Sequence, residues 1–128
     1  MKKNLTGVII VAAGKGKRTK VPIPKQYLKF GHKTILGKNI ENFINQSLIH
    51  FVLVVIDKDH TDFYEDVIKK INSVKLLPRC FGGKTRSESV KNGLMAIKNI
   101  GCTKILIQDA ARPFTSGDII KNCINRLD

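Results

Sequence analysis

The feature that most constrains the fold is a short apolar run that ends in a loop of glycine and basic residues. The run, residues 8–13, holds six apolar residues, four of which are β-branched. Such a run is typical of a strand that is covered on both faces, as in a parallel sheet packed between helices. Its last two residues, Ala12 and Ala13, are small and leave room for a ligand to approach the backbone. We therefore expect residues 8–13 to form the first strand of an α/β sheet.

The loop after this strand has the composition of an anion-binding site. Gly14 and Gly16 can adopt backbone angles that are closed to other residues, so successive N–H groups can turn toward one point. Lys15, Lys17 and Arg18 add positive charge around that point. The sequence therefore predicts that this loop binds a phosphate.

Three familiar motifs do not account for these residues. A dinucleotide fingerprint requires a third glycine where Thr19 stands. Residues 83–85 end like a Walker A loop, but Pro78 occupies the position of its first glycine. A signal peptide would need a small-residue cleavage site after the apolar run, and three basic residues stand there instead. We set all three motifs aside.

Length and composition indicate one soluble globular domain. The chain has 128 residues, of which 42% are hydrophobic and 26% charged. No apolar stretch is long enough to span a membrane, so we expect no membrane partner. The cysteines form no Cys-x-x-Cys pair, which argues against a zinc site and a disulfide framework and favours a reducing, cytoplasmic location. They are Cys80, Cys102 and Cys123.

The net charge of +13 is concentrated around the glycine loop. Residues 1–40 contain ten Lys or Arg and no acidic residue, whereas the remaining 88 contain thirteen basic and ten acidic residues. Part of the excess is also explained by a coding bias toward Lys, Ile and Asn on a solvated surface. No helix-turn-helix, finger or basic-zipper pattern is present and aromatic content is only 6%, which argues against nucleic-acid binding.

Apolar runs and helical patterns alternate along the rest of the chain. This alternation predicts an open, mostly parallel, Rossmann-like sheet with helices on both faces, which binds ligands at the carboxyl ends of its strands. Further strands are expected over residues 51–56, 74–77 and 105–107. Four helices are expected, over residues 34–46, over 61–71, from Thr85 onward and over 116–127. The second should have Phe63, Val67, Ile68 and Ile71 inward. The third should have Val90, Leu94 and Ile97 inward.

A second glycine-basic loop enters the third predicted helix. Gly83 and Lys84 precede Thr85 and Glu88, which have the spacing of a capping box. This segment is either an ordinary helix start or a site where free N–H groups face a phosphate or a nucleotide ring. Local sequence does not choose between the two.

Asp109 directly follows the strand expected at residues 105–107. A carboxylate there, beside two basic loops, is suited to a magnesium ion that bridges phosphates; the alternative is a turn or helix-cap aspartate. No Ser, Cys or His arrangement indicates a protein nucleophile. A site that positions phosphates and neutralises their growing charge is typical of phosphoryl or nucleotidyl transfer, with Arg18 and Lys25 as the cations.

Four segments together resemble the 2-C-methyl-D-erythritol 4-phosphate cytidylyltransferase family, whose fold is of the nucleotide-diphospho-sugar transferase type. The segments are residues 12–18, 24–27, 82–90 and 109–113. The resemblance implies transfer of a cytidylyl group from CTP to methylerythritol phosphate, with release of pyrophosphate and the help of Mg²⁺, in the non-mevalonate isoprenoid pathway.

The resemblance also implies residue roles. Arg18 and Lys25 would stabilise the charged transition state, and Asp109 would hold the metal. Val11 stands where the family usually has proline, a change that also occurs in relatives fused to a cyclodiphosphate synthase, and Lys84 stands where an acidic residue is common. The expected nucleotide-binding residues are Ala12, Ala13, Gly14, Gly16, Gly83, Lys84, Ser89, Asp109 and Ala110.

The resemblance reaches about the first half of the family's domain. We therefore expect residues 1–128 to be the N-terminal part of a single nucleotidyltransferase domain, which forms a homodimer when complete. A second polypeptide could supply the other half and cover the apolar edge beside the strand before Asp109. Two alternatives remain: a catalytically incomplete nucleotide-binding fragment, and a cytidylyltransferase for another sugar phosphate.

Overall fold

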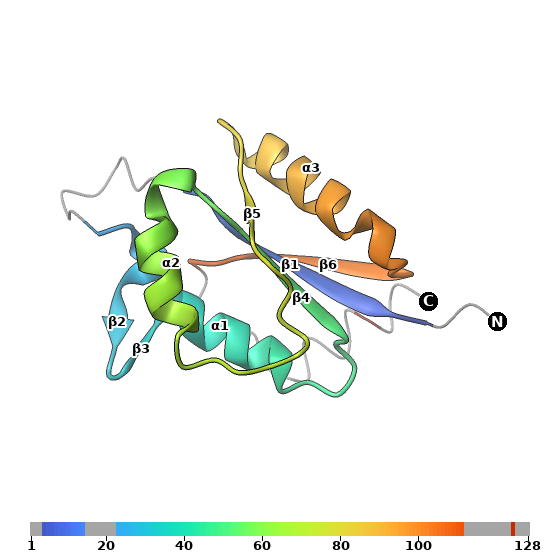
Figure 1. Cartoon of the computed structure of the whole chain (residues 1–128), viewed down its shortest axis with the longest axis horizontal. Coiled ribbons are helices and arrows are strands. Elements are labelled where there is room, and N and C mark those ends of the chain that lie inside the picture. Colours follow the sequence, from blue (N-terminus) through green and yellow to red (C-terminus); the bar gives the residue numbers. More distant parts are fainter. Residues whose placement is uncertain (1–3, 15–22, 112–123, 125–128) are drawn as a thin grey trace.

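The computed structural model describes residues 4–14, 23–111 and 124 (Figure 1). Its centre is a four-stranded parallel sheet with the order β5–β4–β1–β6. The two inner strands, β1 (Thr6–Ala12) and β4 (Phe51–Ile56), are the apolar runs noted above and are almost wholly buried. The outer strands are β5 (Cys80–Phe81) and β6 (Lys104–Asp109).

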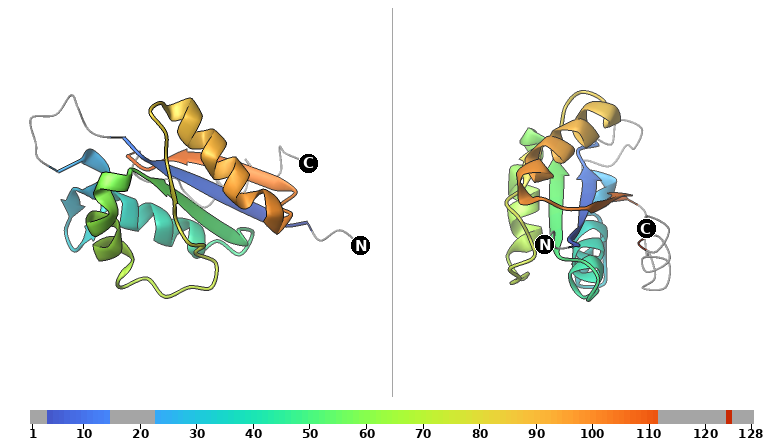
Figure 2. Two further views of the ribbon diagram at one scale, coloured as in Figure 1. Left: turned by 45° about the horizontal axis from the view of Figure 1, so that its top comes forward. Right: turned by 90° about the vertical axis from the view of Figure 1, so that its right-hand side faces the viewer.

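Helices pack on both faces of this sheet, as expected from the sequence (Figures 1 and 2). One face is covered by α1 (Ile35–Ile44) and α2 (Thr61–Ile68), and the other by α3 (Arg86–Ile97). The side chain of Thr34 caps α1 by accepting a hydrogen bond from the N–H of Gly37 at 2.9 Å. The smaller elements are the 3₁₀ turns η1 (Lys25–Tyr27), η2 (Lys58–His60) and η3 (Lys98–Ile100), and a hairpin of β2 (Lys29–Phe30) and β3 (Lys33–Thr34).

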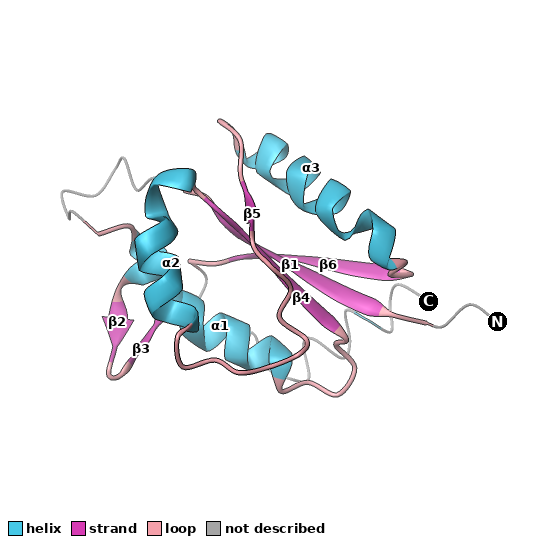
Figure 3. Ribbon diagram, in the orientation of Figure 1, coloured by secondary structure: helices cyan, strands magenta, loops and turns pink. Residues whose placement is uncertain are grey.

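The strand predicted at residues 74–77 is wrong. Figure 3 shows a long loop between α2 and β5, in which Leu76 makes only an isolated bridge to Val52. Val74, at the start of the predicted strand, is 98% exposed. Regular pairing begins only beyond Pro78, at β5, where the register with β4 is shifted by one residue from that of the Leu76 bridge.

The inward faces of two helices also differ from the prediction. In α2, Tyr64 is fully buried, whereas Phe63, which was expected inward, is partly exposed. In α3, Leu94 is partly exposed and the buried positions are Ser89, Gly93 and Ile97. The apolar pattern was misleading here because α3 lies so close to the sheet that small residues are needed on its inner face.

The strand expected to be buried at residues 105–107 lies at an edge of the sheet instead. Within the described part of the chain, β6 pairs only with β1, and Ile107 is 42% exposed. The helix predicted over residues 116–127 lies outside the described residues, apart from Ile124, which is buried in the core with α1. Among the described residues, the sheet is therefore well covered at β1 and β4, and β6 has no strand on its outer side.

Candidate functional site

The carboxyl ends of the parallel strands meet at one edge of the sheet. The register aligns Ala12 of β1 with Ile56 of β4, and Ile56 with Phe81 of β5. On the other side of β1, Val11 is aligned with Asp109 of β6. This arrangement brings the two glycine loops and Asp109, far apart in the sequence, to the same edge.

The first glycine loop begins at the end of β1, where Gln26 holds it. The side-chain amide of Gln26 donates to the carbonyl oxygens of Ala12 at 2.9 Å and Gly14 at 3.0 Å. Ala12 is buried, whereas Gly14 is exposed and has open space around its Cα. The predicted site residues Gly16 and Arg18 lie outside the described residues.

Lys25 is exposed, and its two neighbours in η1 are fixed in place. Gln26 is bonded to the end of β1, and Tyr27 packs on the aromatic rings of α2 and η2. The ring of Tyr27 stacks on Phe63 at 5.2 Å and meets His60 edge-on at 5.8 Å. The backbone of Lys25 is therefore anchored beside the first glycine loop while its ammonium group faces solvent.

The second glycine loop touches the first through Gly82. A Cβ at Gly82 would lie 2.5 Å from the Oγ of Ser89 and would also collide with the Cβ of Ala13. Only glycine allows this approach. The structure thus places Ala13 and Ser89, two of the predicted site residues, on either side of one glycine.

The N–H groups at the start of α3 are partly used within the loop. Gly83 donates to the Oγ of Ser89 at 3.1 Å, and Lys84 donates to a carboxylate oxygen of Glu88 at 2.8 Å. The hydroxyl of Thr85 accepts from the N–H of Glu88 at 3.1 Å, as in a capping box. These bonds agree with an ordinary helix start, the first of the two alternatives for this segment.

Asp109 is paired with a residue whose role the sequence did not reveal. The Nε of Arg86, in the first turn of α3, donates to Oδ1 of Asp109 at 3.1 Å. Both side chains are solvent-accessible, so this pair contributes little to folding stability. It links the second glycine loop to the end of β6 and keeps a cation beside the predicted metal ligand.

Ala110 is held by a second residue that sequence reasoning missed. Its N–H donates to the carbonyl of Val11 at 3.0 Å, and its carbonyl accepts from the side chain of Asn39 at 2.7 Å. Asn39 is buried in α1. An asparagine on the inward, otherwise apolar face of a helix was the available signal, because a buried amide needs a polar partner.

The donor set at this edge fits a magnesium ion only in part. Among residues 4–14, 23–111 and 124, no group of three or more His, Cys, Asp or Glu is placed to hold a metal. Mg²⁺ is commonly bound by one or two carboxylates together with substrate phosphates and waters. The accessible carboxylate of Asp109 suits such a shared site, and it would have to exchange its contact with Arg86.

The described cysteines do not provide a nucleophile. Burial raises the pKa of the Cys80 thiol, although the nearby Arg79 opposes the shift, and burial also raises the pKa of Cys102. A thiol with a raised pKa is mostly protonated at neutral pH and reacts slowly.

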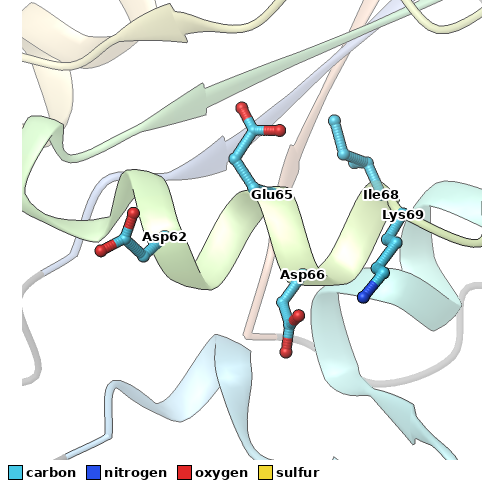
Figure 4. Close-up of a pocket in the computed structure, with 5 residues that line it drawn as sticks. All are labelled: Asp62, Glu65, Asp66, Ile68 and Lys69. Carbon is cyan, nitrogen blue, oxygen red and sulfur yellow. The ribbon is translucent and has the colours of Figure 1, made fainter.

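A shallow hollow on the outside of α2 is separate from this edge (Figure 4). Its side chains do not converge, since the carboxylates of Glu65 and Asp66 point to opposite sides of the helix. The lining residues are Asp62, Glu65, Asp66, Ile68 and Lys69. No helix in the described ranges is long and apolar enough to cross a membrane.

Comparison with known proteins matches nearly the whole chain to one enzyme family. The family model described as IspD: 2-C-methyl-D-erythritol 4-phosphate cytidylyltransferase matches residues 6–128. A 2-C-methyl-D-erythritol 4-phosphate cytidylyltransferase of Clostridium botulinum is 44% identical over 128 residues, which are 100% of this chain and 55% of that protein. A bifunctional enzyme IspD/IspF of Wolbachia pipientis wMel is 39% identical over 126 residues, 98% of this chain and 32% of that protein.

The fold matches a solved structure of the same kind. The crystal structure of 4-diphosphocytidyl-2C-methyl-D-erythritol synthase from Anaerococcus prevotii superposes with a TM-score of 0.81 at 27% identity, covering 97% of this chain and 51% of that one. The chain thus spans about half the length of the single-function relatives that it matches.

Proposed function

Because the chain belongs to the 2-C-methyl-D-erythritol 4-phosphate cytidylyltransferase family, we propose that it forms the nucleotide-binding part of such an enzyme. The proposed reaction transfers a cytidylyl group from CTP to 2-C-methyl-D-erythritol 4-phosphate in the non-mevalonate isoprenoid pathway. The observation that carries the proposal is the family match over residues 6–128. Residues 1–128 are then the N-terminal part of a single nucleotidyltransferase domain.

In this proposal the nucleotide lies across the strand ends. The close approach of Ala13, Gly82 and Ser89 supports a continuous surface made by both glycine loops. Ala12 and Ala110 are buried and would shape the floor of the site from below. The proposed nucleotide contacts are Ala12, Ala13, Gly14, Gly16, Gly83, Lys84, Ser89, Asp109 and Ala110.

The proposed chemistry is an in-line displacement at phosphorus. A phosphate oxygen of the acceptor attacks the α-phosphorus of CTP, and the bond from that phosphorus to the oxygen bridging the α- and β-phosphates breaks, so pyrophosphate leaves. Cations that face the phosphate oxygens stabilise the growing charge. We assign this role to Lys25 and Arg18. Mg²⁺, held by Asp109 and phosphate oxygens, would neutralise further charge when bound.

A second candidate is a fragment that binds nucleotide without catalysis. It is favoured by β6, which pairs only with β1 among the described residues and exposes Ile107. Within the first candidate, we propose that a homodimer forms in the complete domain and that further chain, or a second polypeptide, covers β6. A cytoplasmic location belongs to the same proposal and is supported by Cys80 and Cys102, which are free thiols.

Pyrophosphate release tests these candidates. CTP, Mg²⁺ and methylerythritol phosphate are supplied to the chain alone and to the chain mixed with the remaining half of the Clostridium botulinum relative. Release of pyrophosphate by the chain alone or by the mixture supports cytidylyl transfer to methylerythritol phosphate. In a parallel assay ribitol phosphate replaces methylerythritol phosphate, and release only there indicates another sugar phosphate as acceptor. CTP binding without release in any mixture supports the fragment, and absence of CTP binding contradicts both candidates.

Lys25 offers a sharper test wherever release is observed. Lys25→Ala should lower kcat by about 100- to 1000-fold, because a well-placed cation at the transition state is lost. Lys29→Ala is the matched control, since Lys29 is an exposed lysine on β2. Equal rates for the two variants would exclude the proposed role of Lys25.

A further inference from the structure

We propose that Gln26 is a positioning residue that holds the end of β1 in the shape that receives the nucleotide. The proposal rests on the nucleotide-binding function proposed above. It concerns a residue that is not among the proposed contacts to CTP. Gln26 would act through the backbone of Ala12 and Gly14 and through its neighbour Lys25.

The geometry of one amide group carries the proposal. Nε2 of Gln26 donates to the carbonyl of Ala12 at 2.9 Å and to that of Gly14 at 3.0 Å. These two bonds use both hydrogens of the amide nitrogen. The side chain is only 5% exposed, so the bonds form with little competition from water. One rigid group therefore fixes the path of the chain from the last residue of β1 to the first glycine of the loop.

The same bonds turn two carbonyl oxygens away from a phosphate. Carbonyl oxygens carry partial negative charge and would repel a phosphate if they faced it. At the end of β1 the oxygens of Ala12 and Gly14 are aimed at Gln26 and satisfied there. The loop can then present other groups to an anion. A glutamate at this position would bring only acceptors, and a methionine would bring no donor at all.

Gln26 also ties the proposed catalytic cation to the loop. Lys25 and Gln26 are consecutive residues of η1, a turn closed by the bond from the N–H of Tyr27 to the carbonyl of Pro24 at 2.9 Å. Tyr27 is packed against Phe63 on the other side. Among the described side chains, that of Gln26 is the one recorded as bonded to both ends of the Ala12–Gly14 segment. Loss of its donors should loosen the loop and Lys25 together.

The test compares two substitutions at this position with a matched control. Gln26→Glu keeps the shape and removes the donors, and Gln26→Met keeps the length without a charge. Gln46→Glu makes the same chemical change in the loop between α1 and β4, at the opposite end of β4. The full chain is used, and the measurements are the dissociation constant for CTP with Mg²⁺, the thermal midpoint, and amide hydrogen exchange of the peptide that contains Ala12 to Gly14.

We expect both Gln26 variants to bind CTP about 10- to 100-fold more weakly than the wild type, because two hydrogen bonds are lost. Exchange should rise about tenfold in the Ala12–Gly14 peptide and stay unchanged in α3. When the pH is lowered from 8 to 5.5, the CTP affinity of Gln26→Glu should move closer to that of the wild type at the same pH. The reason is that a protonated carboxyl group regains one donor. Gln46→Glu should match the wild type throughout.

The possible failures are distinguishable. If the wild type binds CTP and the Gln26 variants bind within twofold of it, the assignment of Gln26 is overturned while the proposed function stands. A loss of affinity that only mirrors the fraction of unfolded protein, with no local rise in exchange, also overturns it in favour of a purely structural role. If the wild type does not bind CTP, the proposed function itself is contradicted, and the role of Gln26 with it.

Discussion

The two faces of the sheet are packed by different means. Toward α1 and α2, the core is built from large side chains that are completely enclosed, among them Phe43, Leu36 and Ile40. Toward α3 the core is smaller, and the helix comes close to β1 and β4 at Gly93. One face is stabilised by the larger volume that it buries. On the other, α3 approaches the sheet closely at Gly93, where the helix has no side chain.

This difference means that some substitutions should affect mainly the stability of the fold and others mainly the geometry of the candidate site. Part of the candidate site lies on the α3 side: Ala13 packs in the smaller core, and Ser89 and Arg86 belong to α3. On the other side, Ala12 and Ala110 pack in the core with α1. Changes to apolar side chains of α1 that do not contact the site, such as Phe43, should therefore lower stability without reshaping it. Changes on the α3 face should cost less stability and shift the two glycine loops relative to each other.

The largest effect is expected from Phe43→Ala on the α1 face. Phe43 is 2% exposed, and truncating a buried phenylalanine costs about 3–5 kcal/mol through lost burial and the cavity left behind. Urea denaturation measures the free energy of unfolding. Phe30→Ala is the control, because Phe30 is 55% exposed, and it should change stability by less than about 0.5 kcal/mol. Similar losses of stability for Phe43→Ala and Phe30→Ala would contradict the conclusion that the α1 face is stabilised by its buried side chains.

An intermediate effect is expected from Gly93→Ala on the α3 face. The new Cβ would lie 2.9 Å from Cγ2 of Ile9 and 3.0 Å from Cγ2 of Val55, so α3 must move outward. Overpacking of this kind costs about 1–3 kcal/mol, and the better helix propensity of alanine returns about 1 kcal/mol. We expect a net loss on urea denaturation, with weaker CTP binding.

A double variant checks the cause of that loss. Adding Val55→Ala removes the Val55 methyl group that the new Cβ would meet. The pair should then lose less stability than the sum of the single losses, as expected for residues in contact. A net gain of stability from Gly93→Ala alone would show that α3 is not closely packed on the sheet.

The part of this architecture that depends on local sequence was predictable, and the part that depends on distant partners was not. β1 and β4 were found because a fully apolar run identifies a buried strand by itself. The small inward residues of α3 depend on how near the helix lies to the sheet. The exposed edge at β6 was expected only through the family resemblance, which covers about half of the family's domain. The location of the site at the strand ends followed from the fold class.

The supporting residues show the same limit. Asn39 reaches Ala110 across 71 positions of sequence, and Arg86 reaches Asp109 across 23. No pattern within one segment could pair them. Gln26 stood inside one of the four segments that carry the family resemblance, but its role became visible only when its two carbonyl partners were placed beside it. The nucleotide contacts named from the sequence remain predictions.

A smaller loss is expected from Ser89→Ala, which tests the α3 face at the site. Its hydroxyl accepts from the N–H of Gly83, and removal leaves that donor without its partner at a cost of about 1 kcal/mol. The second glycine loop should loosen, and CTP affinity should fall more than stability does. Ser87→Ala, at an exposed position of the same helix, is the control. Unchanged CTP affinity for Ser89→Ala would remove Ser89 from the site.

The smallest effect near neutral pH is expected from Tyr64→Phe on the α1 face. The hydroxyls of Tyr64 and Tyr27 are buried and have no hydrogen-bond partner among the described residues. Deleting an unpaired buried hydroxyl leaves no new unsatisfied group, so stability should stay the same or rise by up to about 1 kcal/mol. A loss above about 1 kcal/mol would reveal a hydrogen-bond partner for this hydroxyl.

Alkaline pH amplifies this small difference. Burial, the main cause, raises the pKa of Tyr64 far above its usual value of about 10, and the charge of Glu65 adds to the shift while Arg79 opposes it. The unfolded chain therefore loses this proton at a lower pH than the folded chain. The contribution of this hydroxyl to folding stability is fully present below about pH 10 and is lost as pH rises toward the folded-state pKa, by up to about 1.4 kcal/mol per pH unit.

Urea denaturation at alkaline pH tests this. Tyr64→Phe should make stability fall less steeply with pH, and Tyr27→Phe should do the same, because burial also raises the pKa of Tyr27. If the free energy of unfolding fell equally steeply with alkaline pH for the wild type and both variants, these hydroxyls would be open to solvent. The α1 face would then not be enclosed as described.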